Sequence, residues 1–295
     1  MKMKAERYLS PKQAAEAIGA SESSLKRWCD KGLLSMTKTA GGHRRIPVAE
    51  LLEFSRAHGH QLTRPELLGL PRGTAGPRDY QEAVRALANA LQHGHGGAVE
   101  QIALSLLAAG TTVIDACDRL IAPAVAAVRD ARSRGELPLF CERRALALAD
   151  GLVHRLSQFT AEATKGHRAL CSGIRDAADS TALNLLWVGL RALGFQVEHL
   201  GNHNAVDTVC VALAELRPSI VAVASDGSPW SERRTDRFVR LADCAARLAV
   251  PMVIVGNGID PNARVRLRYA TCIHSLSELS SFVDTVVSKS HRLMH

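Results

Sequence analysis

The sequence predicts a multidomain protein in which α-helical parts are followed by an α/β part. Three observations support this prediction. The first 58 residues combine short helical segments with a Gly-Gly turn, a long Ala/Leu-rich helical stretch follows, and short apolar runs then alternate with helical segments. A chain of 295 residues is long enough for two or three domains. We therefore divide it into domains at 1–58, 78–165 and 166–295, with a Gly- and Pro-rich linker at 59–77.

The charge of the chain is unevenly distributed. The net charge is +8, and residues 1–60 contain 11 Lys and Arg against 6 Asp and Glu, whereas the other residues contain 26 against 23. A basic segment favours a polyanionic partner such as nucleic acid. The seven cysteines form no CxxC pair, which is typical of a reduced, cytoplasmic protein. The sequence has no apolar signal segment and no run of about 18 apolar residues, so we expect no membrane partner.

The first domain has the start and stop signals of two short helices. Ser10 precedes a proline, which is typical of a helix start, and Gly19 ends that helix. A second helix is expected from Ser21 to about Lys31, where Gly32 can adopt the left-handed conformation that stops it.

A β-hairpin and a third helix complete this domain. Segments 33–38 and 44–46 can pair across the Gly-Gly turn. Segment 47–56 has helical apolar spacing, and its inward-facing residues are expected to be Leu51, Leu52 and Phe54.

This order of elements suits a module that places its second helix in the major groove of DNA and its basic hairpin on the neighbouring backbone. The residues expected to contact DNA are Ser21, Ser23, Ser24, Lys26, Arg27, Lys38, Thr39, Gly42, His43, Arg44 and Arg45. Trp28, spaced with Leu25 and Leu33, is instead expected to pack in the core between the helix and the hairpin.

Residues 6–56 resemble the MerR-type winged helix-turn-helix, including its shorter excisionase-like relatives. The residues that support the resemblance are Ser10, Ala14, Ala15, Ile18, Ser21, Leu25, Trp28, Gly32, Leu33 and the run Gly41-Gly42-His43-Arg44-Arg45-Ile46. The resemblance implies a DNA-binding domain of a transcription regulator.

Residues 78–165 predict a four-helix bundle because they are rich in Ala and Leu and almost free of breakers. The helices are expected at 79–93, 96–109, 112–134 and 140–164. Pro123 lies inside the third helix, where it cannot donate the hydrogen bond to the preceding turn and can kink the helix.

In the last domain, five short apolar runs alternate with helical segments. This pattern predicts a five-stranded parallel sheet of the flavodoxin or Rossmann-like kind. The strands are expected at 169–174, 196–200, 220–225, 252–256 and 272–274. Ligands of such sheets bind beyond the carboxyl ends of the strands.

The helical bundle and the sheet together, about residues 78–290, resemble the cobalamin-binding unit of MerR-type light and cobalamin regulators, the CarH-like proteins. The local phrases that support the resemblance are Leu120-Ile121-Ala122-Pro123-Ala124, Arg134-Gly135-Glu136-Leu137, Leu193-Gly194-Phe195-Gln196-Val197 and Val255-Gly256-Asn257-Gly258. The resemblance implies a cap bundle above a cofactor-binding sheet.

The residues that would bind cobalt in that family are missing. Its Asp/Glu-x-His-x-x-Gly motif falls on Ala177, Asp179 and Ala182, and a carboxylate is a weak replacement for imidazole on cobalt(III). The cap positions that hold a tryptophan and a Glu-His pair in the family read Arg132 and Glu142-Arg143. We therefore assign no cofactor, and the sequence argues against histidine-ligated cobalamin.

Two interpretations of this unit stay open. In one, it has kept the fold without the cofactor and serves oligomerisation or partner binding. In the other, charged residues, Arg175 among them, line a pocket that binds an anionic ligand other than cobalamin. The residues of this candidate pocket are Arg132, Glu142, Arg143, Asp176, Asp179, Ser225, Gly256 and Gly258.

The sequence thus favours a DNA-binding transcription regulator that binds double-stranded DNA as a homo-oligomer, with RNA polymerase as a candidate partner. No paired carboxylates and no nucleophile–base arrangement are visible, so we expect no enzymatic activity and no metal site. The alternatives are a cobalamin-dependent light or ligand sensor, a cobalamin-carrying enzyme component, and an architectural DNA-associated protein without a ligand.

Overall fold

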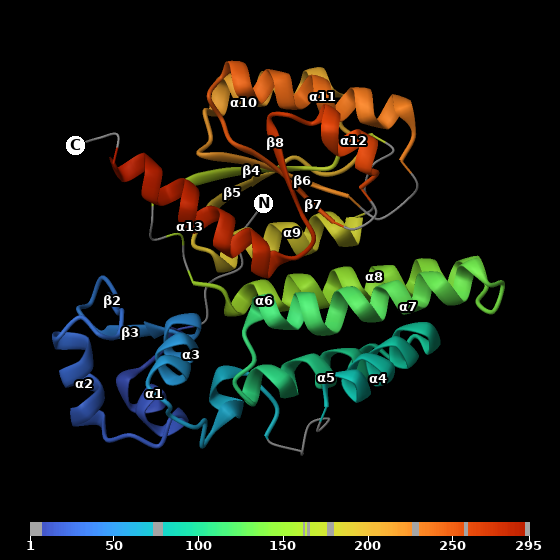
Figure 1. The fold of residues 1–295 in the computed structure, drawn as a ribbon. Helices are drawn as coiled ribbons and strands as arrows, with labels where there is room; N and C mark the ends of the chain where they lie inside the picture. Colours follow the sequence, from blue (N-terminus) through green and yellow to red (C-terminus); the bar gives the residue numbers. More distant parts are fainter. Residues whose placement is uncertain are drawn as a thin grey trace. The chain divides into compact units, whose positions relative to one another are not determined.

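The structure is a computed structural model that describes residues 8–72, 79–161, 163, 166–175, 180–225, 230–256 and 259–292, without the side chains of 286–292. The chain forms two compact units, Met1–Ala161 and Glu162–His295. Figure 1 shows both, and each is described separately. The first contains the predicted DNA-binding domain and the helical bundle, and the second contains the predicted α/β domain.

Three helices form the N-terminal segment: α1 (Pro11–Ala17), α2 (Glu22–Asp30) and α3 (Val48–Ala57). Ser10 caps α1 because its hydroxyl accepts from the Gln13 backbone N–H, while the Gln13 side chain accepts from the Ser10 N–H. Ser21 caps α2 in the same way, accepting from the Ser24 N–H at 3.1 Å. Gly32 follows α2 with φ +71°, as its position in the sequence predicts.

A small antiparallel sheet accompanies these helices, with strand order β1-β3-β2. Its strands are β1 (Tyr8–Leu9), β2 (Thr37–Lys38) and β3 (Arg44–Pro47). The predicted hairpin is confirmed, since Thr37 pairs with Arg45 and Lys38 with Arg44. Strand β1 was not predicted, because two residues are too short for a recognisable pattern.

The core of this segment differs from the prediction at two residues. Leu51, Leu52 and Phe54 are buried as predicted. However, Leu33 is exposed, and Leu34 enters the core in its place.

Trp28 packs against aromatic rings of α3 and of the turn that follows it. Its ring packs on the Phe54 ring of α3, with centroids 4.9 Å apart, and on His60 at 5.1 Å. Trp28 therefore joins α2 to α3 and to the turn that follows α3.

The segment 59–72, the described part of the predicted linker, folds against α1. It contains the short helix η1 (Pro65–Leu68), and both Leu68 and Leu70 are buried. The Thr63 N–H donates to Ala17 O at 2.8 Å, and the Thr63 hydroxyl donates to Glu16 O at 2.7 Å. These bonds occupy carbonyls at the end of α1 that have no partner within the helix.

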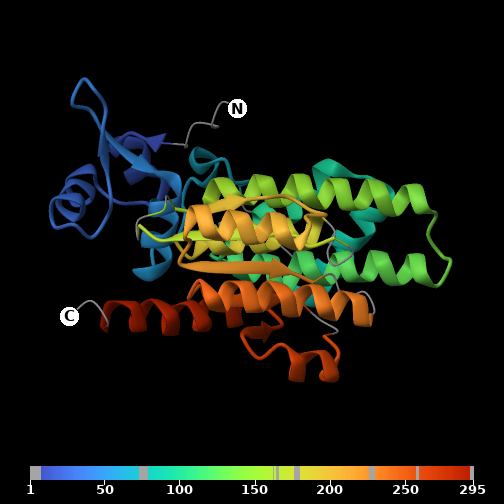
Figure 2. The same cartoon turned by 90° about the horizontal axis from the view of Figure 1, so that it is seen from above.

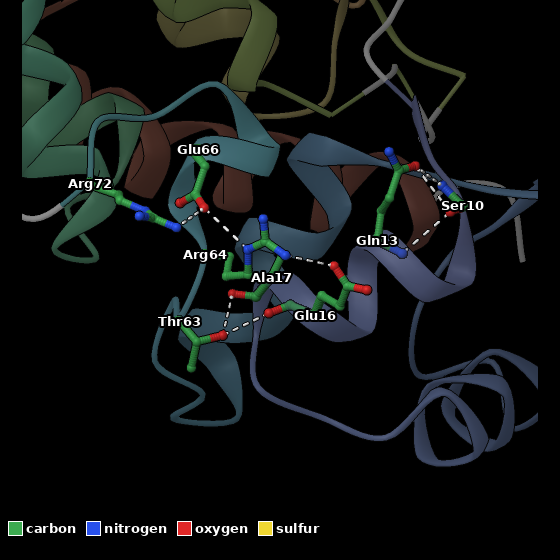
Figure 3. A network of polar contacts seen from close by, with 8 residues as sticks. All are labelled: Ser10, Gln13, Glu16, Ala17, Thr63, Arg64, Glu66 and Arg72. Atoms are coloured by element: carbon green, nitrogen blue, oxygen red, sulfur yellow. Dashed lines mark hydrogen bonds and ion pairs between the residues drawn. The ribbon is translucent and has the colours of Figure 1, made fainter.

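An ion-pair network strengthens this contact (Figure 3). Arg64 pairs with Glu16 at 3.0 Å and with Glu66 at 3.2 Å, and Arg72 pairs with Glu66 at 2.8 Å. Hydrogen bonds from Arg72, the Glu66 backbone and Arg64 lower the pKa of the Glu66 carboxyl from 4.5 to about 2. The carboxylate is therefore the form that the folded state favours.

A pH effect is expected from this shift. Because the folded-state pKa of Glu66 is depressed, its contribution to stability is complete above 4.5 and is lost as the pH falls towards about 2. The stability difference between wild type and Glu66→Gln should therefore shrink in acid, and a ¹³C-NMR titration of the Glu66 carboxyl should give a midpoint near 2. Glu82→Gln, at an exposed position on helix α4 (Tyr80–His93), is the control. A titration midpoint of the Glu66 carboxyl near the ordinary value of 4.5 would contradict its pairing with Arg64 and Arg72.

The helical bundle in the same unit consists of antiparallel helices. Its elements are α4 (Tyr80–His93), α5 (Gly96–Ala108), α6 (Val113–Ala116), η2 (Cys117–Ile121), α7 (Ala122–Ser133), α8 (Leu139–Leu156) and η3 (Ser157–Phe159). The segment η2 is a π-helical turn directly before α7, and Pro123 explains it, because proline cannot donate the regular bond back to Arg119. The predicted final helix, 140–164, is too long, since Thr160 is extended and its hydroxyl bonds Ser157 O.

The second unit is a five-stranded parallel sheet of Rossmann-like architecture with order β5-β4-β6-β7-β8. Its elements are β4 (Arg168–Ser172), α9 (Ser180–Ala192), β5 (Gln196–His199), α10 (Val206–Leu216), β6 (Ile220–Ala224), α11 (Glu232–Arg247), β7 (Met252–Val255), α12 (Pro261–Arg266), β8 (Ala270–Ile273) and α13 (Leu276–Arg292). Helices α10, α11 and α12 cover one face, and α9 and α13 cover the other (Figure 1).

Apolar side chains of the strands form the core of this unit. Strand β6 is buried along its whole length, and Phe238 of α11 is completely buried against the sheet. A strand covered on both faces is expected to be continuously apolar. Among the described residues, no helix is both long and apolar enough to cross a bilayer.

Candidate nucleic-acid interface

Helix α2 presents a polar face because its apolar residues point inward. Leu25 and Cys29 are buried, whereas Ser23, Lys26 and Arg27 are exposed. The spacing of Leu25 and Cys29 places both on one side of the helix. The predicted base-facing residues therefore share the solvent side of α2.

Three serines gather at the start of α2. The Ser21 hydroxyl donates to the Ser24 hydroxyl at 2.9 Å and lies 2.9 Å from the Ser23 hydroxyl. Short hydroxyls at a helix N-terminus can bond phosphates or base edges. Ser23 is exposed, whereas Ser24 is partly buried, so the Ser23 hydroxyl is the more accessible of the two to DNA.

The hairpin between β2 and β3 projects from the helices of its segment (Figure 2). Its tip is closed by two bonds, from Thr39 N–H to His43 O at 2.9 Å and from Gly42 N–H to Thr39 O at 2.8 Å. Gly42 has φ +78°, which side chains rarely adopt, so glycine suits this turn. The predicted residues Lys38, Thr39, Gly42 and His43 are all exposed on this tip.

A basic hollow of about 470 Å³ lies where the hairpin, α2 and the start of α1 meet. It is lined by Ser10, Pro11, Lys26, Gly42, His43, Arg44 and Arg45. Five predicted DNA-binding residues therefore come together, although α2 and the hairpin are separate in sequence. A concave surface with several cations suits a phosphate group.

Ion pairs hold part of this basic surface in place. Arg44 pairs with Asp30 of α2 at 2.9 Å, and Lys26 pairs with Glu22 at 3.0 Å. Both pairs are partly exposed, so each contributes little to stability, and a phosphate can compete for the cations. Burial raises the pKa of the Cys29 thiol on the inner face, while Arg44 opposes that shift.

The residues of the predicted ligand pocket lie in both units. In the first unit, Arg132 at the end of α7 approaches Glu142 of α8 at 3.8 Å, and Arg143 is exposed. In the second unit, Ser225 and Gly256 are adjacent, since a Cβ added at Gly256 would lie 2.0 Å from Ser225 O. The remaining predicted residues, Asp176, Asp179 and Gly258, lie outside the described residues.

A buried arginine accompanies Ser225. Arg234 of α11 is 3% exposed, and its guanidinium donates to the Ser225 hydroxyl at 2.9 Å. The guanidinium also lies 4.8 Å from the centre of the Trp230 ring. The Ser225 hydroxyl is therefore engaged within the protein.

Sequence reasoning missed two kinds of residue near these sites. Ser10 and Pro11 line the basic hollow, but their only signal was a helix start. Arg234 is one of several arginines in a charged helix, and nothing in the pattern separates it from its exposed neighbours. Both roles depend on contacts between residues distant in sequence.

Residues 8–58 match the family model of a helix-turn-helix domain. The match coincides with the elements β1 to α3 and with the basic hollow. The N-terminal segment is therefore a helix-turn-helix domain, which suggests DNA binding. No curated protein matches the chain.

Solved structures resemble most of the chain. The monomethylamine corrinoid protein of Methanosarcina barkeri is 16% identical with a TM-score of 0.58, covering 70% of this chain and 98% of its own. A cobalamin-binding protein of Desulfitobacterium hafniense DCB-2 is 16% identical with a TM-score of 0.37, covering 69% and 98%. The methanol:cobalamin methyltransferase complex MtaBC of M. barkeri is also 16% identical, with a TM-score of 0.37 and coverage of 77% and 90%.

The likeness to the corrinoid protein concerns the fold. In this chain that fold is a helical bundle followed by a five-stranded parallel sheet. Function depends on the residues at the site rather than on the fold.

Proposed function

We propose that this protein is a DNA-binding transcription regulator of MerR type, with a winged helix-turn-helix domain and a cobalamin-binding-like unit that does not use histidine-ligated cobalamin. Helix α2 would enter the major groove, and the β2–β3 hairpin would act as the wing on the neighbouring backbone. The observation that supports this proposal most strongly is the hollow shared by Lys26, Arg44 and Arg45.

In this arrangement, α2 would determine the DNA sequence that is recognised, and the hairpin would contribute affinity for any sequence. The exposed polar residues of α2 can reach base edges, where Arg27 offers a planar group that matches guanine. The cations around the hairpin can contact phosphates, which raise affinity for any sequence. A symmetric DNA site would require a homo-oligomer, and RNA polymerase is the partner that a regulator of this kind would need.

The test is a DNA selection from random duplexes with the full-length protein, followed by affinity measurements across salt. We expect enrichment of a palindromic sequence and a linear fall of log affinity with log salt concentration. Arg27→Ala should relax the preference at one position of the selected site, while Lys38→Ala should weaken binding to all sequences alike. Failure to enrich any sequence would contradict a specific regulator.

The α/β unit does not offer a histidine where the family would bind cobalt. No histidine occurs in the sequence between His167, just before β4, and His199, at the end of β5. His167 lies at the opposite end of β4 from the expected site, and His199 Nδ1 accepts from the Gly201 N–H at 3.1 Å.

The end of β4 is also bonded to the neighbouring loop. The Gly173 N–H donates to Gly201 O at 3.0 Å, and the Asn204 N–H donates to Gly173 O at 3.1 Å. A Cβ added at Gly173 would lie 1.9 Å from Asn202 Oδ1, so this stretch is closely packed. These contacts support the proposal that the α/β unit has kept its fold without histidine-ligated cobalamin. The unit would then serve sensing or oligomerisation.

Incubation with methylcobalamin or adenosylcobalamin, followed by desalting, is expected to leave no corrin absorbance on the protein. The physical reason is that neither imidazole near β4 lies on the loop that would present it to cobalt. The corrinoid protein is the positive control. A retained corrin band would favour the alternative of a cobalamin-dependent sensor or a cobalamin-carrying enzyme component.

A further inference from the structure

A second cavity lies in the first unit, away from the basic hollow. Its volume is about 570 Å³, and it lies between the end of α3, the turn that follows it and the end of α5, open to solvent on one side. Leu52 and Leu107, both buried, belong to its wall, together with Ala108. A cavity of this size suits a small organic molecule.

Arg56 supplies a positive charge to this cavity. It lines the cavity and is half-buried. Burial lowers the pKa of the Arg56 guanidinium, while the charges of Glu53 and Asp115 oppose this shift. Among the described residues, none hydrogen-bonds to this guanidinium or forms an ion pair with it. Its donors are therefore available to a bound molecule.

The turn that follows α3 is closed by two hydrogen bonds between Ser55 and His60. The His60 N–H donates to Ser55 O at 2.9 Å, and the Ser55 hydroxyl donates to His60 O at 2.5 Å. The His60 ring packs on Phe54 with centroids 5.6 Å apart and lies beside Trp28. A preformed wall reduces the entropic cost of binding.

We propose that this cavity binds a small organic carboxylate, whose carboxylate group pairs with Arg56 and whose body lies against Ala108 and Ala109 at the end of α5. A guanidinium matches a carboxylate with two parallel hydrogen bonds. The cavity volume of about 570 Å³ is larger than an inorganic anion needs, which favours an organic body. The cavity is lined by residues of α3, of α5 and of the turns that follow them, and none of these residues lines the basic hollow.

The test is calorimetric titration of the full-length protein with sodium benzoate, with sodium chloride matched in both solutions. Benzamide, which has nearly the same shape without the charge, is the comparison ligand. We expect benzoate to bind in the millimolar range or below, and Arg56→Gln to weaken it by about tenfold or more. The variant should have little effect on benzamide.

Two further variants keep the proposal falsifiable. Arg85→Gln removes an exposed arginine of α4 and should leave benzoate binding unchanged. Ala108→Phe fills the cavity and should abolish binding of both ligands even if Arg56→Gln fails to fold. Absence of benzoate binding to the wild type, or equal binding to the wild type and a folded Arg56→Gln protein, would overturn the proposal.

Discussion

Replacing both Arg44 and Arg45 with alanine is expected to weaken duplex DNA binding by roughly one to two orders of magnitude near 0.1 M salt. Both arginines line the basic hollow, and Arg45 lies opposite Thr37 in the hairpin. Each lost phosphate contact should lower the slope of log affinity against log salt concentration by about 0.9. The measurement is fluorescence anisotropy of a labelled duplex over a series of salt concentrations.

A matched charge change distinguishes a local contact from the net charge of the protein. Arg85→Ala, combined with loss of a second exposed arginine, Arg143, removes the same charge from the helical bundle. This control should alter neither the affinity nor the salt slope appreciably. The double variant also loses the pair between Arg44 and Asp30, so its thermal unfolding must be measured alongside. An unchanged salt slope in a folded double variant would refute the proposed wing contact.

Truncation of Phe238 to alanine is expected to destabilise the α/β unit by about 3–5 kcal/mol, because it leaves a cavity in a closely packed core. Phe238 is fully buried, and its ring lies 5.0 Å from that of Trp230. Urea unfolding followed by tryptophan fluorescence should report this change, since Trp187 and Trp230 are both in the second unit.

Phe140→Ala is the matched control for this prediction. Phe140 is 67% exposed at the start of α8, so the same chemical change there should alter stability by no more than about 0.5 kcal/mol. If Phe238→Ala unfolds completely, Phe238→Leu provides a milder change with the same direction. If Phe238→Ala lowers the free energy of unfolding no more than the control does, the assignment of Phe238 to the core is contradicted.

Much of the fold follows from signals between near neighbours in the chain. Ser10 and Ser21 are caps, Gly32 stops α2, and the Gly-Gly turn lets β2 and β3 pair. The strands of the α/β unit are short apolar runs, although the last begins at Ala270, before the predicted 272. Each of these features depends on the conformational preference or the apolar spacing of a few consecutive residues. The same signals predicted that the basic residues of α2 and of the hairpin belong to one DNA-binding surface.

Other features depend on residues far apart in sequence, and only the tertiary structure decided them. The folding of 59–72 on α1 requires Thr63 and Arg64 to meet the end of a helix more than forty positions earlier. The contact of Trp28 with α3, the burial of Arg234 beside Ser225 and the isolation of Arg56 in a cavity have the same origin. A sequence pattern shows which residues share a face, but burial and partners depend on what packs against that face.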